Sequence, residues 1–213
     1  EKLVNVTWAQ DGSWHTKNIG TILANGFRQV NIQEVEEFIP KFALPLLSMT
    51  TSPMPELSDT LPNIDSLTEL PAWRAALGLS TDHTLTSYQG EIDPFPSAAS
   101  LLTFCQFLQF GKGVSNYLIF LNIEKSPLVR KAQVEICNPI KPQIILGNFE
   151  VTNNSATSIN LDQLGFHQND LPIILCKDMA GIPVYLSMVN DGSFMSLEHT
   201  HPPASLVIHG NRW

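Results

Sequence analysis

The sequence has 213 residues, of which 43% are hydrophobic and 15% are charged, so it has enough apolar material for a packed core and too little charge for intrinsic disorder. The formal net charge is −8 and the twelve lysines and arginines are scattered, which excludes nucleic acid as an expected partner. The apolar runs have strand length, far below the roughly 20 residues of a membrane-spanning helix, so no membrane segment is expected. These bounds predict a single globular domain over residues 1–213.

The first third of the chain predicts a strand, a short helix and an irregular passage. Val4 and Val6 alternate with polar neighbours, as in a strand. Asn31 and Glu34 form a capping pair that opens a short helix, which ends before Pro40. Residues 50–69 are rich in Pro, Ser, Thr, Asp and Asn and predict a loop. A linker between domains is the alternative, but the roughly fifty residues before it are marginal for an independent core.

Two further helices are expected, over residues 71–77 and 97–110. The first begins with proline and is followed by Gly78, the usual asymmetry of helix ends. The second has Ser97 as its cap and Gly111 as its stop. Its apolar residues recur at helical spacing, at Leu101, Phe104, Cys105 and Leu108. The pattern therefore predicts a buried helix in the middle of the chain.

The second half of the chain predicts a sheet. Short apolar or alternating runs are separated by turns rich in Pro, Gly and Asn, at 117–123, 129–137, 143–152, 172–176 and 184–189. Most of the intervening segments are too short for crossover helices, which favours antiparallel pairing. We therefore expect an α+β fold, with a mainly antiparallel or mixed sheet in the C-terminal half and a few helices in the N-terminal half.

A hairpin near the C-terminus carries the one group of residues that predicts a site. Asn190-Asp191-Gly192 predicts a tight turn, after which residues 193–201 continue as a strand. Alternation then places four side chains on one face, Met195, Leu197, His199 and His201. Two imidazoles about 7 Å apart can converge on one divalent transition metal ion. His209 is the nearest candidate for a third ligand, with His167, His83 and Asp191 in reserve.

The run His199-Thr200-His201-Pro202 resembles fragments of two metal-site motifs, the HxH pair of cupins and the HxHP run of JAMM metalloproteases. Ser205 stands near the position of the cupin glutamate, and no Asp follows Pro202, so neither family is assigned. The alternative for the pair is a turn segment, in which Pro202-Pro203 ends the strand and the histidines face solvent or backbone carbonyls.

Two other groups of residues have chemical potential. Glu91 and Asp93 would share a face of an extended segment, as paired carboxylates in acid/base or metal sites do. The alternative is an acidic turn that complements a helix N-terminus. Cys105, Cys137 and Cys176 are odd in number and set among apolar neighbours, which indicates reduced core thiols and a cytoplasmic location.

Two functions are compatible with these patterns. The first is an accessory module that binds a small molecule or a protein partner. The second is a metal-assisted enzyme built around His199 and His201. The sequence contains no nucleophile elbow, phosphate-binding glycine loop or dinucleotide fingerprint, which argues against the common motif-bearing hydrolases, nucleoside triphosphatases and Rossmann enzymes. Neither a catalytic residue nor a cofactor-binding residue is assigned beyond the metal ligands.

Overall fold

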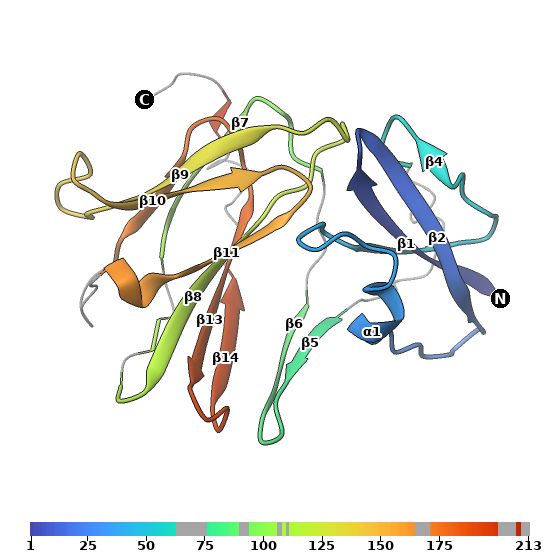
Figure 1. The fold of residues 1–213 in the computed structure, drawn as a ribbon, viewed down its shortest axis with the longest axis horizontal. Helices are drawn as coiled ribbons and strands as arrows, with labels where there is room; N and C mark the ends of the chain where they lie inside the picture. Colours follow the sequence, from blue (N-terminus) through green and yellow to red (C-terminus); the bar gives the residue numbers. More distant parts are fainter. Residues whose placement is uncertain are drawn as a thin grey trace. The chain divides into compact units, whose positions relative to one another are not determined.

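The computed structural model describes residues 1–62, 76–89, 94–105, 108–109, 111–164, 171–199 and 208–209. In this part of the chain 51% of the residues are in strands and 5% are helical, so the protein is a β protein and the α+β prediction is wrong. Every strand pairing is antiparallel. Strands occur in both halves of the chain (Figure 1), which corrects the expectation that helices fill the N-terminal half.

The chain divides into two compact units. Unit 1 contains residues 1–75 and 124–129, and unit 2 contains residues 76–123 and 130–213. The single domain expected from the sequence stays a prediction, because compactness does not measure whether the two units unfold together.

Unit 1 is built on a four-stranded sheet in the order β3-β1-β2-β4. The strands are β1 (Lys2–Gln10), β2 (Ser13–Ile22), β3 (Leu46–Thr50) and β4 (Leu57–Ser58). The turn between β1 and β2 is formed by Asp11 and Gly12, whose φ angles of 51° and 78° are both positive. Asp-Gly favours these angles in two-residue hairpin turns, which explains why the chain reverses here. The strand predicted at Val4 and Val6 is confirmed as part of β1.

The two faces of this sheet are packed in different ways. On one face Val6 and Trp8 join Val35 of the helix α1 (Ile32–Val35) in a hydrophobic cluster. On the other face the buried side chains are mostly polar and bond to one another. Asn5 Nδ2 donates to Thr50 Oγ1 at 2.9 Å, and the hydroxyls of Thr7 and Thr16 are 3.0 Å apart. Buried polar groups of this kind are stable only when they are paired, as they are here.

The short helix predicted after Asn31 is confirmed as α1. The backbone N–H of Asn31 donates to Glu34 Oε1 at 3.0 Å, which is the reciprocal half of a capping box. The predicted loop at 50–69 starts at the last residue of β3 and contains the two-residue strand β4. Residues 63–69 lie outside the described part of the chain.

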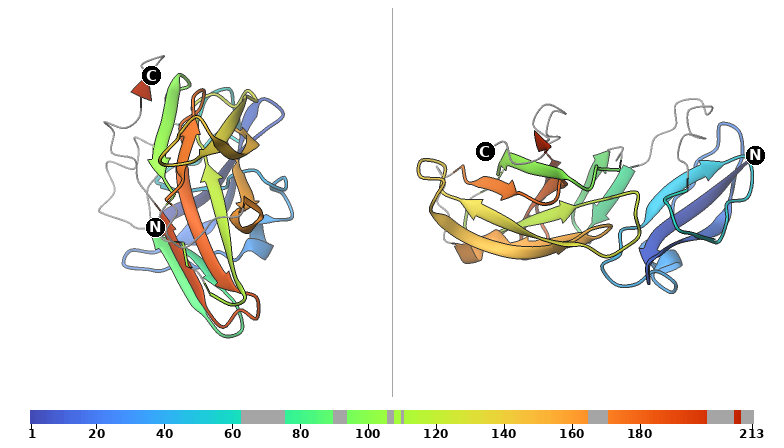
Figure 2. Two further views of the ribbon diagram at one scale, coloured as in Figure 1. Left: turned by 90° about the vertical axis from the view of Figure 1, so that its left-hand side faces the viewer. Right: turned by 90° about the horizontal axis from the view of Figure 1, so that it is seen from above.

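Unit 2 contains two larger sheets and a separate hairpin (Figures 1 and 2). The five-stranded sheet has the order β10-β9-β12-β7-β15, and the four-stranded sheet has the order β11-β8-β13-β14. The strands of the first are β10 (Ile145–Thr152), β9 (Lys131–Cys137), β12 (Ile173–Cys176), β7 (Ala99–Phe104) and β15 (Ile208–His209). Those of the second are β11 (Ala156–Asn160), β8 (Val114–Leu121), β13 (Ile182–Val189) and β14 (Met195–His199). The five strands predicted in this half are thus confirmed, with ends that differ by a few residues.

The main core of unit 2 lies between its two sheets, which makes this unit a β-sandwich. Alternate residues of β8, including Leu118 and Phe120, face alternate residues of β9 and β12, including Val134 and Ile174. The outer face of the four-stranded sheet has its own apolar cluster. Leu79 of the hairpin formed by β5 (Ala76–Ser80) and β6 (Leu85–Gln89) packs against that cluster. The hairpin therefore covers part of the outer face.

The helix predicted over 97–110 is wrong, because this segment contains the strand β7. Leu101 and Cys105 are buried as expected, but Ala99 is buried with them, so the burial repeats every two residues. Phe104, expected in the core, is 49% exposed. An apolar run of this kind fits both periods, and pairing with β12 and β15 decides in favour of a strand. Residues 106, 107 and 110 lie outside the described part.

The other predicted helix, 71–77, is also corrected where the structure describes it. Ala76 and Leu77 are the first residues of β5, so no helix reaches Leu77. Their backbone pairs with β6 in an antiparallel hairpin, with Leu77 opposite Tyr88. Residues 71–75 lie outside the described part of the chain.

Candidate functional site

The hairpin that carries the predicted histidines is confirmed. β13 pairs with β14, Val184 lies opposite His199, and Gly192 has a φ of 72° in the turn. Leu197 is buried in the cluster on the outer face of the four-stranded sheet. His199, two residues on, lies on that same face by alternation and is half-buried. The predicted strand begins two residues later than expected, since β14 starts at Met195, and residues 200–201 lie outside the described part of the chain.

The structure does not test the predicted metal site. His201 lies outside the described residues, and His209 is described only as backbone in β15, opposite Ala99. His199 is thus in the four-stranded sheet and His209 in the five-stranded sheet. Among the described residues no group of three or more His, Cys, Asp or Glu side chains can hold a metal ion. We therefore do not propose a metal-assisted reaction.

The structure does not place the reserve ligands in that site. His83 is exposed in the turn between β5 and β6. His167 lies outside the described residues. Asp191 is part of the hairpin turn, where hydrogen bonds from the side chain and backbone of Ser193 hold its pKa below the usual value. The turn is fixed further by Thr81 and Thr84, whose hydroxyls donate to the Gly192 carbonyl at 2.8 and 3.0 Å. Asp191 therefore has a structural role in the turn.

The sequence also singles out a pair of carboxylates and three cysteines. The paired carboxylates Glu91 and Asp93 lie outside the described residues. The three cysteines are free and buried, as the sequence indicates. Burial raises the pKa of Cys105 to about 12 and the pKa of Cys176 to about 11, and it also raises the pKa of Cys137. A thiol is nucleophilic as the thiolate, so none of these is an activated nucleophile.

We expect the native protein to resist alkylation at about pH 9, because the buried thiols stay protonated while unfolded thiols are about half ionised. Stability should fall as the pH rises from 9 towards 12, since the unfolded chain then loses thiol protons that the folded chain retains. Iodoacetamide labelling followed by mass spectrometry measures the reactivity. Labelling in denaturant is the control, and native thiols that react as fast as denatured ones would contradict the expectation.

A buried polar network closes one end of the β-sandwich. Asn116 of β8 and Ser187 of β13 are paired in register, and Ser187 Oγ donates to Asn116 Oδ1 at 2.6 Å. Asn116 Nδ2 donates to the Gln109 carbonyl at 3.0 Å, and the backbone N–H of Asn116 donates to Asp162 Oδ1 at 3.1 Å. The network joins β8 and β13 to the segment before β8 and to the turn η2 (Leu161–Leu164). Its bonds are internal, so it stabilises the fold.

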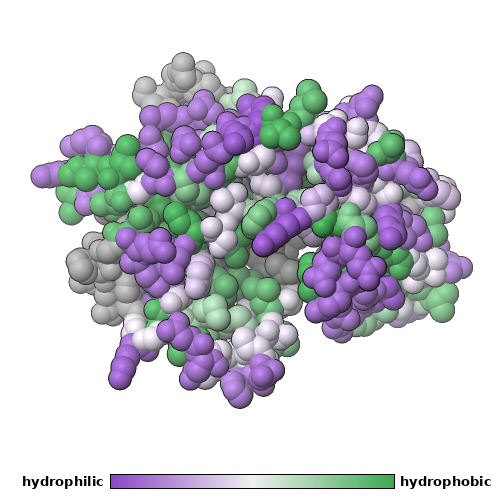
Figure 3. Space-filling model, viewed as in Figure 1, coloured by the Kyte–Doolittle hydropathy of each residue, from purple (hydrophilic) through white to green (hydrophobic). Residues whose placement is uncertain are grey.

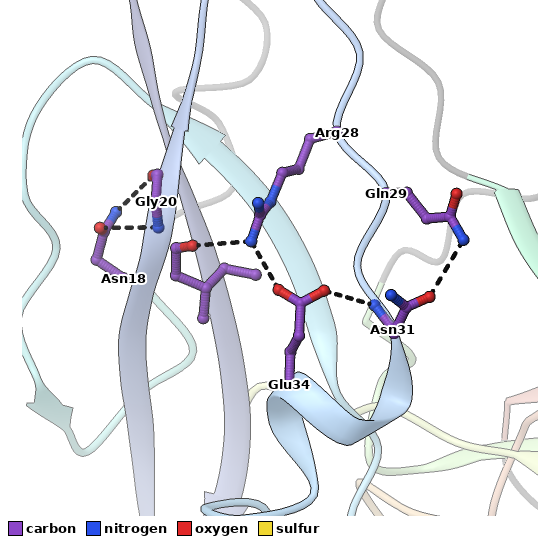
Figure 4. Close-up of polar contacts among 7 residues, drawn as sticks. Asn18, Gly20, Arg28, Gln29, Asn31 and Glu34 are labelled. Atoms are coloured by element: carbon purple, nitrogen blue, oxygen red, sulfur yellow. Dashed lines mark hydrogen bonds and ion pairs between the residues drawn. The ribbon is translucent and has the colours of Figure 1, made fainter.

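Another polar group, in unit 1, ties the loop between β2 and α1 to the sheet (Figure 4). The register of β1 and β2 shifts by one residue at Ile19, which leaves this residue in a β-bulge. Arg28 Nη2 donates to the Ile19 carbonyl at 3.2 Å and to Glu34 Oε2 at 2.7 Å. Asn18 Nδ2 donates to the Gly20 carbonyl, and the backbone N–H of Gly20 donates to Asn18 Oδ1. The Arg28 side chain thereby ties the loop between β2 and α1 to the bulge in β2 and to Glu34 of α1.

This anchored loop and the first residue of α1 expose three large apolar side chains, which we call the 23–32 surface: Leu23, Phe27 and Ile32. Phe27 is 87% exposed, although it directly precedes the anchored Arg28. The backbone N–H of Gly26 donates to the Leu23 carbonyl at 2.9 Å, which closes a turn over residues 23–26. An exposed apolar group on an ordered loop is typical of protein-binding sites.

Unit 2 has an exposed apolar turn of its own, between β9 and β10. Ile140 is 86% exposed, and Ile144 and Ile145 are also exposed. The hydrophobic surface is visible over this turn (Figure 3). Asn138 orders the turn, because its Oδ1 accepts bonds from the backbone N–H groups of Ile140 and Lys141 at 2.9 Å each. The backbone N–H of Asn138 also donates to the Ile144 carbonyl at 2.9 Å, which closes the turn.

Sequence reasoning missed the 23–32 surface. The signal that could have found it is the placement of Phe27 directly after Asn25-Gly26, where a large apolar residue follows turn residues outside any periodic run. No local sequence pattern predicts the bulge at Ile19, whose carbonyl accepts the hydrogen bond from Arg28.

Comparisons with protein-family models, with curated proteins and with solved structures found no match to this chain. In the described part of the chain, no helix is long and apolar enough to cross a membrane.

Proposed function

We propose that this chain is a protein-interaction module, and that the 23–32 surface of unit 1 is its recognition surface. The observation that supports this most is the nearly complete exposure of Phe27 on a loop that is fixed by Arg28, Glu34 and Ile19. Leaving a phenylalanine in water has no folding benefit, whereas a pre-ordered aromatic anchor lowers the entropic cost of binding.

The chemistry around the 23–32 surface favours a partner with an apolar recess and basic groups beside it. Glu36 and Glu37 are exposed directly after α1, close in the chain to Ile32. The whole chain carries a formal charge of −8, which would speed association with a basic partner and slow it with an acidic one. A small-molecule ligand is less well supported, because the three apolar side chains project outward on a loop.

A cytoplasmic location is part of the same proposal. It rests on the three buried free cysteines, which are typical of proteins in reducing compartments.

Photo-crosslinking from position 27 tests the proposed function. The full chain carrying a benzophenone amino acid at position 27 is irradiated in the cells that produce it, and position 140 is the matched control because Ile140 is 86% exposed. We expect a discrete protein adduct from position 27. An excess of the unmodified chain should suppress it, and an equal excess of a Phe27→Ser variant should not.

The same adducts from both positions would show that position 27 reports only exposure. Equal suppression by the Phe27→Ser variant would show that the partner binds elsewhere on the chain. Either result would overturn the proposed recognition surface.

A further inference from the structure

The outer face of the five-stranded sheet carries an apolar group that the described residues leave uncovered. Leu102 and Phe104 of β7 lie opposite Leu175 and Ile173 of β12 in register. Their neighbours in the chain, including Leu101 and Ile174, belong to the core between the sheets, so alternation places these four on the outer side. In the described part of the chain, none of the four belongs to a hydrophobic cluster.

We propose that this outer face, defined by Leu102, Phe104, Ile173 and Leu175, packs against the same face of a second copy of the chain. The side of a sheet that carries apolar residues is stable when another layer covers it, at a spacing of about 10 Å. Phe104 is 49% exposed and the other three are half-buried, so the group is accessible to such a layer.

The charges beside this apolar group favour a second copy over an oppositely charged partner. On the outer side of β9 and β10, Lys131 Nζ lies 2.6 Å from Glu150 Oε1. Lys177 Nζ lies 3.8 Å from Glu135 Oε2, and Glu135 is opposite Leu175 in register. The charges of these two ion pairs cancel, so among the described residues they add no net charge beside the apolar group, on a chain whose formal charge is −8.

We call the two ion pairs beside the apolar group the rim. Their balanced charge matters because two copies of an acidic protein repel each other over most of their surfaces. A two-fold symmetric interface brings the same patch of both copies together, with each residue facing a different residue of the other copy, so the patch must be self-complementary. Here each copy presents an acid and a base beside the apolar group, and Lys177 of one copy can face Glu135 of the other. The proposed dimer interface consists of residues of unit 2, whereas the 23–32 surface consists of residues of unit 1.

Sedimentation velocity on the full chain over a range of concentrations tests this interface. The wild-type chain should show a monomer–dimer equilibrium. Phe104→Glu should raise the dimer dissociation constant at least about 10-fold, because the two-fold axis brings two new carboxylates into an apolar contact. Phe194→Glu is the matched control, since Phe194 is 41% exposed beside the β13–β14 turn and should leave dimerisation unchanged. Circular dichroism checks that both variants fold.

A charge exchange tests the rim without changing the apolar group. Glu135→Lys leaves the face positively charged and should weaken the dimer, most strongly at low salt. The double variant Glu135→Lys with Lys177→Glu restores neutrality and should restore the wild-type dissociation constant. A wild-type chain that stays monomeric at every concentration would overturn the proposal. So would a Phe104→Glu chain that dimerises like wild type, and if that variant does not fold, the charge exchange decides.

Discussion

Replacing Leu101 with alanine is expected to lower the free energy of unfolding by about 2 to 5 kcal/mol, the range for a fully buried leucine whose removal leaves a cavity. Leu101 is fully buried in β7, within the core between the two sheets of unit 2. The matched control is Leu85→Ala, because Leu85 of β6 is 75% exposed. Its cost should stay within about 0.5 kcal/mol.

Urea denaturation followed by circular dichroism measures both variants. Leu108→Ala should lower the free energy of unfolding less than Leu101→Ala, since Leu108 is only half-buried at the edge of the core cluster. Equal losses at positions 101 and 85 would show that β7 does not occupy the core as described.

Replacing Asn116 with alanine should destabilise the protein by about 1 to 3 kcal/mol for each buried polar group that it leaves without a partner. The affected groups are the Gln109 carbonyl and the Ser187 hydroxyl, which keeps only the bond that it accepts from the Gln109 N–H. Asn116 and Ser187 are almost completely buried, so water cannot replace the lost bonds without opening the sheet.

A double-mutant cycle separates this network from simple loss of volume. Ser187→Ala should cost less in the Asn116→Ala background than in the wild-type protein, with a coupling of about 0.5 to 3 kcal/mol. Additive losses would mean that the 2.6 Å contact between Ser187 and Asn116 does not contribute to stability.

Local signals in the sequence predicted some elements because the residues themselves dictate the backbone. Asn190-Asp191-Gly192 gave the hairpin between β13 and β14, and the pair Asn31 and Glu34 gave the helix α1. Asp11-Gly12 carries the same turn signal, and it explains the β1–β2 hairpin that the sequence analysis did not predict. In each case the determinant lies within a few residues of the structure it specifies.

The elements that sequence reasoning misjudged depend on distant partners. Residues 99–105 contain apolar residues at both helical and strand spacing, and only the pairing with β12 and β15 decides between them. The proposed recognition surface depends on contacts six and nine residues apart, which no single turn or capping signal specifies. Phe27 is displayed because Arg28 reaches the bulge at Ile19 and the carboxylate of Glu34. The predicted pair of His199 and His201 remains a prediction, because His201 lies outside the described residues.

The most direct test of the proposed recognition surface is the affinity of the crosslinked partner for three purified chains, measured by isothermal titration calorimetry. Phe27→Ser should raise the dissociation constant about 30-fold or more, as the loss of an aromatic anchor worth about 2 kcal/mol requires. Ile140→Ser, which removes an equally exposed apolar group from unit 2, should bind like the wild-type chain. Equal dissociation constants for the wild-type and Phe27→Ser chains would contradict the account.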